Sequence, residues 1–316
     1  MAQGPLYHSE YKHSFSGHET FPLRYGWLKK SYDEIARTQG DPKNKAVFIG
    51  DDAIARFGVG KNMVASMRHW ATCAGVIADS DDGGIRTTEL GDALFGPSGL
   101  DPYMETPSTL WLVHWQLSGR PEKTTWFWAF NNYSGGTFER ETLVRGLEKL
   151  ARQFGWSRVA TATLKRDVEC FVRTYVARPG SSAAGHDDAL ESPLAELGLI
   201  RAIGRRDGFR MVRGAKPTLG DGVFAYALLD FWSRYTSANS LSFEAIAQAP
   251  GSPGRVFLLD ENDVADRLVD IEDSTGGLLR WSETAGLKQV LRQPGVTERD
   301  AAQFFELDYP VRREAA

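Results

Sequence analysis

A short polar segment near the N-terminus is the first place where the sequence could do chemistry. His18, Glu19 and Arg24 fall close together in a stretch that is marked by glycine and proline and bounded by phenylalanines. Together they offer a general base, a carboxylate ligand for a metal ion and a guanidinium clamp for a phosphate. The alternative is structural, because the threonine and proline of this segment could cap and start a helix at Leu23. Both interpretations stay open at this stage.

A pair of carboxylates forms the second candidate site. Asp101 and Glu105 are four positions apart beside a proline. Carboxylate oxygens are preferred ligands of Mg²⁺ and Mn²⁺, so Glu19, Asp101 and Glu105 are the candidate metal ligands. The two cysteines, Cys73 and Cys170, lie within apolar helical patterns and are predicted to be buried core thiols rather than metal ligands.

The element that follows the polar segment is predicted to be a winged helix over residues 47–96. Apolar side chains recur with helical spacing over 51–57 and 61–71, and two glycines mark the turn between these helices. Gly75 ends the second helix, and a hairpin is predicted around the turn at 81–84. In a winged helix the second of these helices enters a DNA groove. The predicted DNA contacts are Lys61, Asn62, Ser66, Arg68 and His69, with Arg86 on the wing.

An acidic run beside the wing supports a different interpretation. Asp79, Asp81 and Asp82 would repel phosphate, and winged helices also serve as protein docking modules. The first unit could therefore bind either nucleic acid or protein.

A second unit of the same kind is predicted over residues 240–292. Two short helices flank a turn at 252–255, and a hairpin follows them. Arg255 is the predicted DNA contact of this unit. A basic hairpin at 199–213 precedes it and adds Arg205, Arg206 and Arg210 as predicted phosphate contacts; the alternative is an edge strand that charge keeps from aggregating.

The stretch between the two units predicts an aromatic core. Residues 109–117 form a helical pattern that is apolar nearly all round, and His114 within it is predicted to be a hydrogen-bonded core residue. The predicted fold class is therefore mainly α with small β-hairpin wings, in which winged-helix domains surround an aromatic helical core. The small, polar residues 178–186 predict a linker between an N-terminal domain, 1–177, and a C-terminal domain, 187–316.

The overall charge limits how the chain could bind nucleic acid. Its 316 residues have a net charge of −4 and a pI of about 5.9. A protein that coats nucleic acid is usually basic, so DNA binding here must come from local patches. The sequence shows no signal-peptide pattern and no apolar stretch of about 18 residues, which predicts a cytoplasmic protein that does not cross a membrane.

Several longer motifs resemble the SspB family, whose members are encoded beside DNA phosphorothioation enzymes. The resemblance extends from about residue 15 to residue 291. It rests on residues 15–21 (FSGHETF), 57–63 (FGVGKNM), 101–103 (DPY), 109–115 (TLWLVHW), 252–257 (SPGRVF) and 283–287 (ETAGL).

This resemblance implies a DNA-binding and DNA-nicking component of a phosphorothioation system that defends against phage. It implies double-stranded DNA and SspA-, SspC- and SspD-like proteins as partners. Hydrolysis of a phosphodiester commonly uses a divalent metal ion, so a Mg²⁺- or Mn²⁺-dependent nicking endonuclease is expected, with His18, Glu19 and Arg24 as its catalytic residues. Two alternatives remain: a non-catalytic winged-helix subunit that recognises DNA, and a scaffold of the modification complex.

Overall fold

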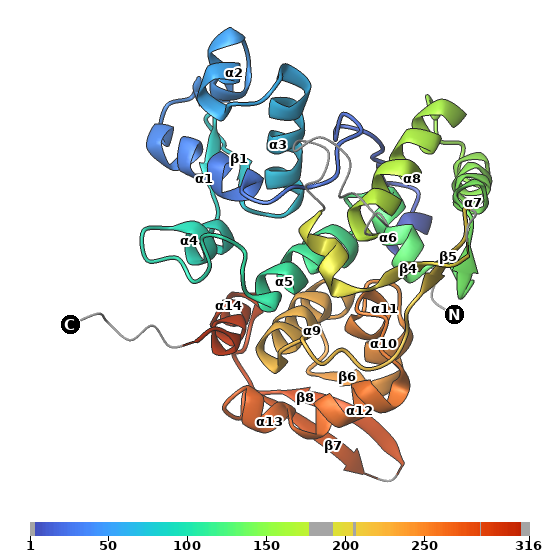
Figure 1. Ribbon diagram of the computed structural model, residues 1–316. Coiled ribbons are helices and arrows are strands. Elements are labelled where there is room, and N and C mark those ends of the chain that lie inside the picture. Colours follow the sequence, from blue (N-terminus) through green and yellow to red (C-terminus); the bar gives the residue numbers. More distant parts are fainter. Residues whose placement is uncertain (1–3, 177–191, 205–206, 285, 311–316) are drawn as a thin grey trace.

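The computed structural model describes residues 4–176, 192–204, 207–284 and 286–310. Within these ranges the protein is mainly helical and contains three small antiparallel sheets. One unit of helices with a hairpin lies at each end of the molecule, and a layer of apolar helices lies between them (Figure 1). The predicted fold class, mainly α with small β-hairpins, is therefore confirmed.

The first unit follows the predicted order of helix, turn, helix and hairpin. Gly58 adopts a left-handed conformation with φ of 68° and ends the first helix of this pair. The second helix buries Val64, Met67 and Trp70, which lie on one face because they recur every three to four positions. The elements are α1 (Trp27–Thr38), α2 (Asp51–Phe57), α3 (Lys61–Cys73), β1 (Ile77–Asp79), β2 (Ile85–Thr87) and α4 (Glu89–Phe95).

A buried asparagine side chain takes the place of a third strand in this unit. The Asn44 amide nitrogen donates to the carbonyl oxygen of Ile85 at 2.6 Å, and the Asn44 amide oxygen accepts from the backbone N–H of Ile85 at 2.7 Å. These two bonds satisfy backbone groups of β2 that a strand would otherwise pair. They also hold the hairpin against the segment that precedes α2.

Four helices form the central layer. α5 is buried along nearly its whole length, as its apolar sequence predicts. His114 Nε2 donates to the Val256 carbonyl oxygen at 2.8 Å, and His114 Nδ1 accepts from the Tyr175 hydroxyl at 2.8 Å, which confirms a hydrogen-bonded core histidine. Burial lowers the pKa of His114 to about 4. The four helices are α5 (Pro107–Ser118), α6 (Thr124–Asn131), α8 (Thr161–Tyr175) and α9 (Asp221–Tyr235).

A three-stranded sheet joins the two halves of the chain. β3 (Thr137–Phe138) pairs with β5 (Phe209–Met211), which pairs with β4 (Ile200–Ala202). α7 (Arg140–Gln153) follows β3 and packs along α8. The predicted linker at 178–186 lies outside the described residues, but the predicted halves on either side of it share this sheet and one hydrophobic core.

The C-terminal unit, like the first one, has helices followed by a hairpin, but it adds a strand before them and two one-turn helices. Its sheet has the strand order β6–β8–β7, so the hairpin β7–β8 pairs with a strand that precedes the helices. The segment predicted as a turn at 252–255 is instead the start of a one-turn helix, because the Ser252 hydroxyl accepts from the backbone N–H of Arg255. The elements are β6 (Ser240–Ser242), α10 (Phe243–Gln248), α11 (Pro253–Val256), α12 (Glu261–Val269), α13 (Ile271–Ser274), β7 (Leu279–Thr284) and β8 (Leu287–Arg292).

The last described segment closes the central layer. α14 (Ala302–Phe305) packs on α9, and the Asp308 carboxylate accepts from the backbone N–H groups of Gly222 and Val223 at the start of α9. A carboxylate at this position accepts hydrogen bonds from backbone N–H groups that have no partner within the helix. Its negative charge also interacts favourably with the positive end of the helix dipole. None of the helices in the described ranges combines the length and the apolar run that crossing a bilayer requires.

Candidate functional site

The polar segment near the N-terminus forms a strained loop, residues 15–21, that we call the N-terminal loop. Four of its residues have left-handed backbone conformations: φ is 70° at Ser16, 87° at Gly17, 46° at Glu19 and 68° at Thr20. Residues other than glycine rarely adopt this backbone conformation. The strain persists only where the surrounding structure holds the residue in place. Strained backbone of this kind concentrates at functional sites, so the loop is the leading candidate.

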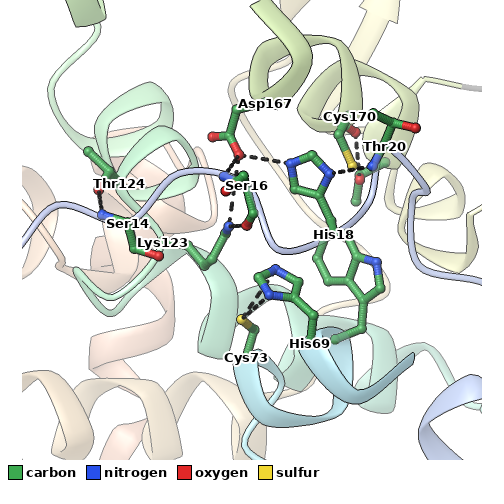
Figure 2. Close-up of polar contacts among 12 residues, drawn as sticks. Ser14, Ser16, His18, Thr20, His69, Cys73, Lys123, Thr124, Asp167 and Cys170 are labelled. Atoms are coloured by element: carbon green, nitrogen blue, oxygen red, sulfur yellow. Dashed lines mark hydrogen bonds and ion pairs between the residues drawn. The ribbon is translucent and has the colours of Figure 1, made fainter. Parts of the chain in front are cut away.

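Helix α8 holds the loop from one side through a buried carboxylate (Figure 2). Asp167 Oδ1 accepts from the backbone N–H of Ser16 and from His18 Nε2, both at 2.8 Å. Nearly two turns further along α8, Arg173 donates to the Thr20 carbonyl oxygen at 3.1 Å. These contacts fix both ends of the strained stretch.

The hydrogen bonds of His18 determine which ring nitrogen has the proton. The backbone N–H of Thr20 donates to His18 Nδ1 at 3.0 Å, so Nε2 bears the hydrogen that is donated to Asp167. Both ring nitrogens are therefore engaged within the protein, and only 1% of the His18 side chain is exposed. In this arrangement His18 holds the loop and does not face solvent.

A buried lysine balances the charge of Asp167. Lys123 Nζ lies 3.9 Å from Asp167 Oδ1 and donates to the Ser16 carbonyl oxygen at 3.2 Å. Burial opposes ionisation of Asp167, but Lys123 and the hydrogen bond from His18 outweigh it and hold the pKa of this carboxyl below its usual value. Asp167 Oδ2 has no hydrogen-bond partner within the described residues.

Helix α3 holds the loop from the opposite side. Ser66 donates to the His18 carbonyl oxygen at 3.0 Å, and the Trp70 indole donates to the Phe21 carbonyl oxygen at 3.0 Å. Gly17 lies directly over His69, because a Cβ atom at position 17 would be 2.5 Å from His69 Nδ1. The prediction that Ser66 contacts DNA is therefore wrong: it faces the loop, and its side chain is fully buried.

His69 and Cys73 form a second, less polar pair beside the loop. Cys73 Sγ lies 3.6 Å from His69 Nε2. Burial, with the nearby Lys123 charge, keeps the pKa of His69 well below its usual value, and burial raises the pKa of Cys73 to about 11. Both groups are therefore neutral near pH 7, so Cys73 is not an activated nucleophile.

The three predicted catalytic residues do not converge. Glu19 is exposed at the tip of the loop, while His18 points inward to Asp167. Arg24 is also buried, and its guanidinium lies over the rings of Phe21 and Trp27 at 5.7 and 5.6 Å. Within the described residues, no hydrogen bond or ion pair joins any two of the three.

The predicted metal ligands do not form a common site either. The Asp101 carboxylate accepts from the backbone N–H groups of Glu105 and Thr106 at 2.9 Å and from the Thr109 hydroxyl at 2.6 Å, which places it at the start of α5. Glu19 and Glu105 are exposed. In the part of the chain that the structure describes, no three His, Cys, Asp or Glu side chains gather as a metal site would require.

The predicted DNA contacts fall into three groups. Lys61 and Asn62 are exposed at the start of α3, where Gly60 supplies no capping side chain, and Arg68 and His69 are half-buried further along it. Arg86 and Arg210 are exposed on β2 and β5, while Arg255 is half-buried at the end of α11. Arg205 and Arg206 lie outside the described residues.

Sequence analysis missed the two residues that organise the loop. Asp167 lies on the apolar face of α8, between Leu164 and Phe171, and Lys123 immediately precedes the apolar helix α6. A charged residue at a buried helical position is an available signal, since such residues are rarely buried without a partner. The partner itself could not be identified, because 149 residues separate Asp167 from His18.

Comparisons with known proteins extend over nearly the whole chain. A family model described as protein of unknown function (DUF4007) matches residues 15–309, beginning at the N-terminal loop. The chain is similar to a magnesium ion-bound crystal structure of SspB, with 29% sequence identity and a TM-score of 0.78, and the match covers 93% of this chain and 96% of that one. A second crystal structure of SspB matches with the same identity and coverage and a TM-score of 0.77. A search of curated proteins found no match.

Proposed function

The chain belongs to the DUF4007 family and is similar to SspB over nearly all its length, and from that premise we propose that it is a DNA-binding and DNA-nicking component of a phosphorothioation system. In such a system sulfur replaces a non-bridging oxygen of a DNA phosphate. The proposed partners are double-stranded DNA and SspA-, SspC- and SspD-like proteins. The observation that supports this proposal best is the strained N-terminal loop, fixed between α3 and α8 with Glu19 exposed at its tip.

The start of α3 supplies the proposed phosphate contact. Gly60 occupies the N-cap position without a capping side chain, and Lys61 and Asn62 follow it at the surface. The exposed N–H groups and positive dipole end of a helix favour an anion. With Arg68 further along, α3 presents cations and no carboxylate. This arrangement is compatible with the helix that enters the groove in a winged helix.

The loop geometry suggests separate roles for the predicted catalytic residues. Glu19 is the exposed carboxylate and is proposed to accept a proton from the water that attacks the phosphate. His18 is proposed as a positioning residue, since its two hydrogen bonds fix the loop that presents Glu19. The predicted ligands Glu19, Asp101 and Glu105 do not fit a shared metal ion, so no step of this proposal passes through one.

Conversion of supercoiled plasmid to open circles by the full-length protein tests this proposal, with Mg²⁺, Mn²⁺ or EDTA present in parallel. We expect Glu19→Gln to reduce nicking at least about 100-fold without changing DNA affinity. Glu283→Gln is the matched control, because Glu283 is an exposed carboxylate on β7 that pairs with Lys288. Nicking by Glu19→Gln at the wild-type rate would overturn the assignment of the site, and absence of nicking by the wild-type protein would overturn the enzyme.

A non-catalytic DNA-recognition subunit is the second candidate function. The observation that favours it is that His18 is buried with both ring nitrogens engaged. Affinity that falls steeply with salt, without nicking, would support this candidate, because phosphate contacts release counterions. A scaffold of the complex would instead show no salt-dependent DNA affinity.

A further inference from the structure

Two adjoining cavities lie between the N-terminal segment and the C-terminal unit, away from the N-terminal loop. One measures about 550 Å³ and is lined by polar groups that include Ser134 and Arg255. The other measures about 510 Å³ and is largely apolar, with Phe127 in its wall. Tyr7, Tyr235 and Pro250 line both, so the cavities meet at these side chains. Each has the size of a small-molecule site.

Two tyrosine rings stand where the cavities meet. Tyr235 follows the buried part of α9, and 44% of it is exposed although its ring packs 4.9 Å from that of Phe231. Tyr7 is half-buried and meets the Phe154 ring edge-on at 5.2 Å. An exposed aromatic side chain beside an apolar cavity offers a stacking surface for another flat ring.

A cation faces the polar cavity. Arg255 Nε donates to the Gln248 carbonyl oxygen at 3.1 Å. Glu244 also lines this cavity, but among the described residues no ion pair joins Glu244 to Arg255. A second guanidinium, that of Arg213, is close enough that burial and repulsion by Arg255 lower its pKa, although Asp260 opposes this. An anion in the cavity would relieve the repulsion and accept charge-assisted hydrogen bonds.

Helix α6 connects this region with the N-terminal loop. Lys123, which contacts the loop, immediately precedes α6, and Asn131 at the end of α6 lines the polar cavity. Eight helical residues span about 12 Å, which equals the rise of three to four stacked base steps at about 3.4 Å each. The distance through the protein from the loop contact of Lys123 to the polar cavity is therefore comparable to the length of a few stacked nucleotides.

We propose that these cavities bind one nucleotide, whose base stacks on Tyr7 and Tyr235 and whose phosphate contacts Arg255. This inference rests on the proposed function, since it assigns a second contact with DNA to the same protein. A free mononucleotide shares the chemistry of a nucleotide that has left the stack of a DNA strand. Extrusion is easiest from single-stranded or mispaired DNA, so a strand of that kind is the expected source.

Fluorescence of a single-stranded oligonucleotide that contains 2-aminopurine tests the stacking contact. We expect the wild-type protein to quench it, Tyr235→Ala to weaken binding between about 5- and 100-fold with loss of quenching, and Tyr235→Phe to retain both. Tyr103→Ala is the matched control, because Tyr103 is the more exposed tyrosine and lies outside both cavities. Wild-type quenching by Tyr235→Ala would overturn the inference.

Calorimetry with deoxyadenosine monophosphate and deoxyadenosine tests the phosphate contact and the source. Arg255→Gln should weaken binding of the monophosphate about tenfold but leave binding of the nucleoside unchanged, and Arg280→Gln on β7 serves as the control. Binding of the oligonucleotide but not the monophosphate identifies a nucleotide within a strand. Salt-dependent binding of duplex DNA that does not depend on Tyr235 or Arg255 would overturn only this inference, whereas failure to bind any DNA would overturn the proposed function.

Discussion

Each of the two units has helices followed by a hairpin, but the helices α3 and α12, which correspond in the two units, have opposite charge. α3 carries Lys61 and Arg68 and contains no carboxylate. α12 carries Glu261, Asp263 and Asp266, and its one arginine is held by Asp221 and by the Leu219 carbonyl oxygen. A shared arrangement of helices therefore does not give a shared binding surface, because the exposed side chains determine what the helix attracts.

The N-terminal ends of α3 and α12 also differ in charge, because only α12 has an acidic cap. α12 begins with a capping box, in which Asp260 accepts from the backbone N–H of Asp263 and the Asp263 carboxylate accepts from that of Asp260. α3 begins after Gly60 without a side-chain cap. The acidic cap satisfies the donors at the start of α12, whereas the donors at the start of α3 stay available to an external anion. Of these two corresponding helices, only α3 is therefore suited to bind a phosphate at its start.

Charge reversal on α3 should have the largest effect, because it should lower DNA affinity far more than the matched change on α12. We expect Lys61→Glu with Arg68→Glu to lower DNA affinity about 1,000-fold, because each change removes one phosphate contact and adds repulsion. The milder Lys61→Ala with Arg68→Ala should reduce the slope of log affinity against log salt by about 2. Both are measured by fluorescence anisotropy at several salt concentrations.

The matched change on the other unit is Glu261→Lys with Asp266→Lys on α12. It should change DNA affinity less than about threefold if that helix does not approach DNA. A larger gain there, or wild-type affinity in the folded α3 variants, would contradict the comparison.

Loss of the buried carboxylate should have the next largest effect, on stability. Asp167→Asn leaves Lys123 buried without its partner and should lower the free energy of unfolding by about 3 kcal/mol at neutral pH. Folding lowers the pKa of Asp167, so the ionised carboxylate stabilises the protein fully above about pH 4, and this stabilisation is lost as the pH falls through the lowered pKa.

Urea unfolding of the wild type and of Asp167→Asn between pH 2 and pH 8 checks this prediction. The difference between the two proteins should be constant above about pH 4 and should shrink below it. Asp266→Asn, at an exposed position on α12, is the control and should change stability by less than about 0.5 kcal/mol. A difference that grows on acidification would contradict the assigned charge of Asp167.

The substitution of Gly17 by alanine should have the smallest of the three effects. It distinguishes the cost of a steric contact with His69 from the cost of backbone strain. Gly17→Ala should cost about 2 kcal/mol, since it combines a left-handed φ with a Cβ atom 2.5 Å from His69 Nδ1. Gly277→Ala, before the hairpin of the second unit, has a similar φ of 83° but no atom within 4 Å, and should cost about 1 kcal/mol. Equal losses in urea unfolding would show that the loop does not press on α3.

Much of the fold could be predicted from the sequence because its signals are local. The glycines at 58 and 60 placed the turn between α2 and α3, and the apolar spacing of Val64, Met67 and Trp70 gave the buried face of α3. The all-round apolar pattern of α5 placed that helix and His114 in the core. The prediction for 252–255 erred because serine and proline are typical both of a turn and of a helix start, and only the hydrogen bond of Ser252 distinguishes them.

The sequence predicted where in the chain the candidate site lies, but not the directions in which its side chains point. The residue types of the loop singled out His18 and Glu19, yet their proximity in sequence did not bring them to one site, because consecutive residues point in different directions. The sequence predicts that Arg24 clamps a phosphate, but its neighbours Phe21 and Trp27 cover it. Side-chain direction depends on what packs around a loop, which sequence spacing does not report.

By itself, the sequence of this protein determined its main helices and its hairpins, which helix faces are apolar, and the positive character of α3. These properties depend on residues within a few turns of one another. Only the tertiary structure decided that Asp167 and Lys123 meet His18, that Ser66 faces the loop, and that Arg255 opens onto a cavity beside Tyr7. These contacts join residues far apart in the chain, and they form only when burial of the aromatic core brings α3, α6 and α8 together.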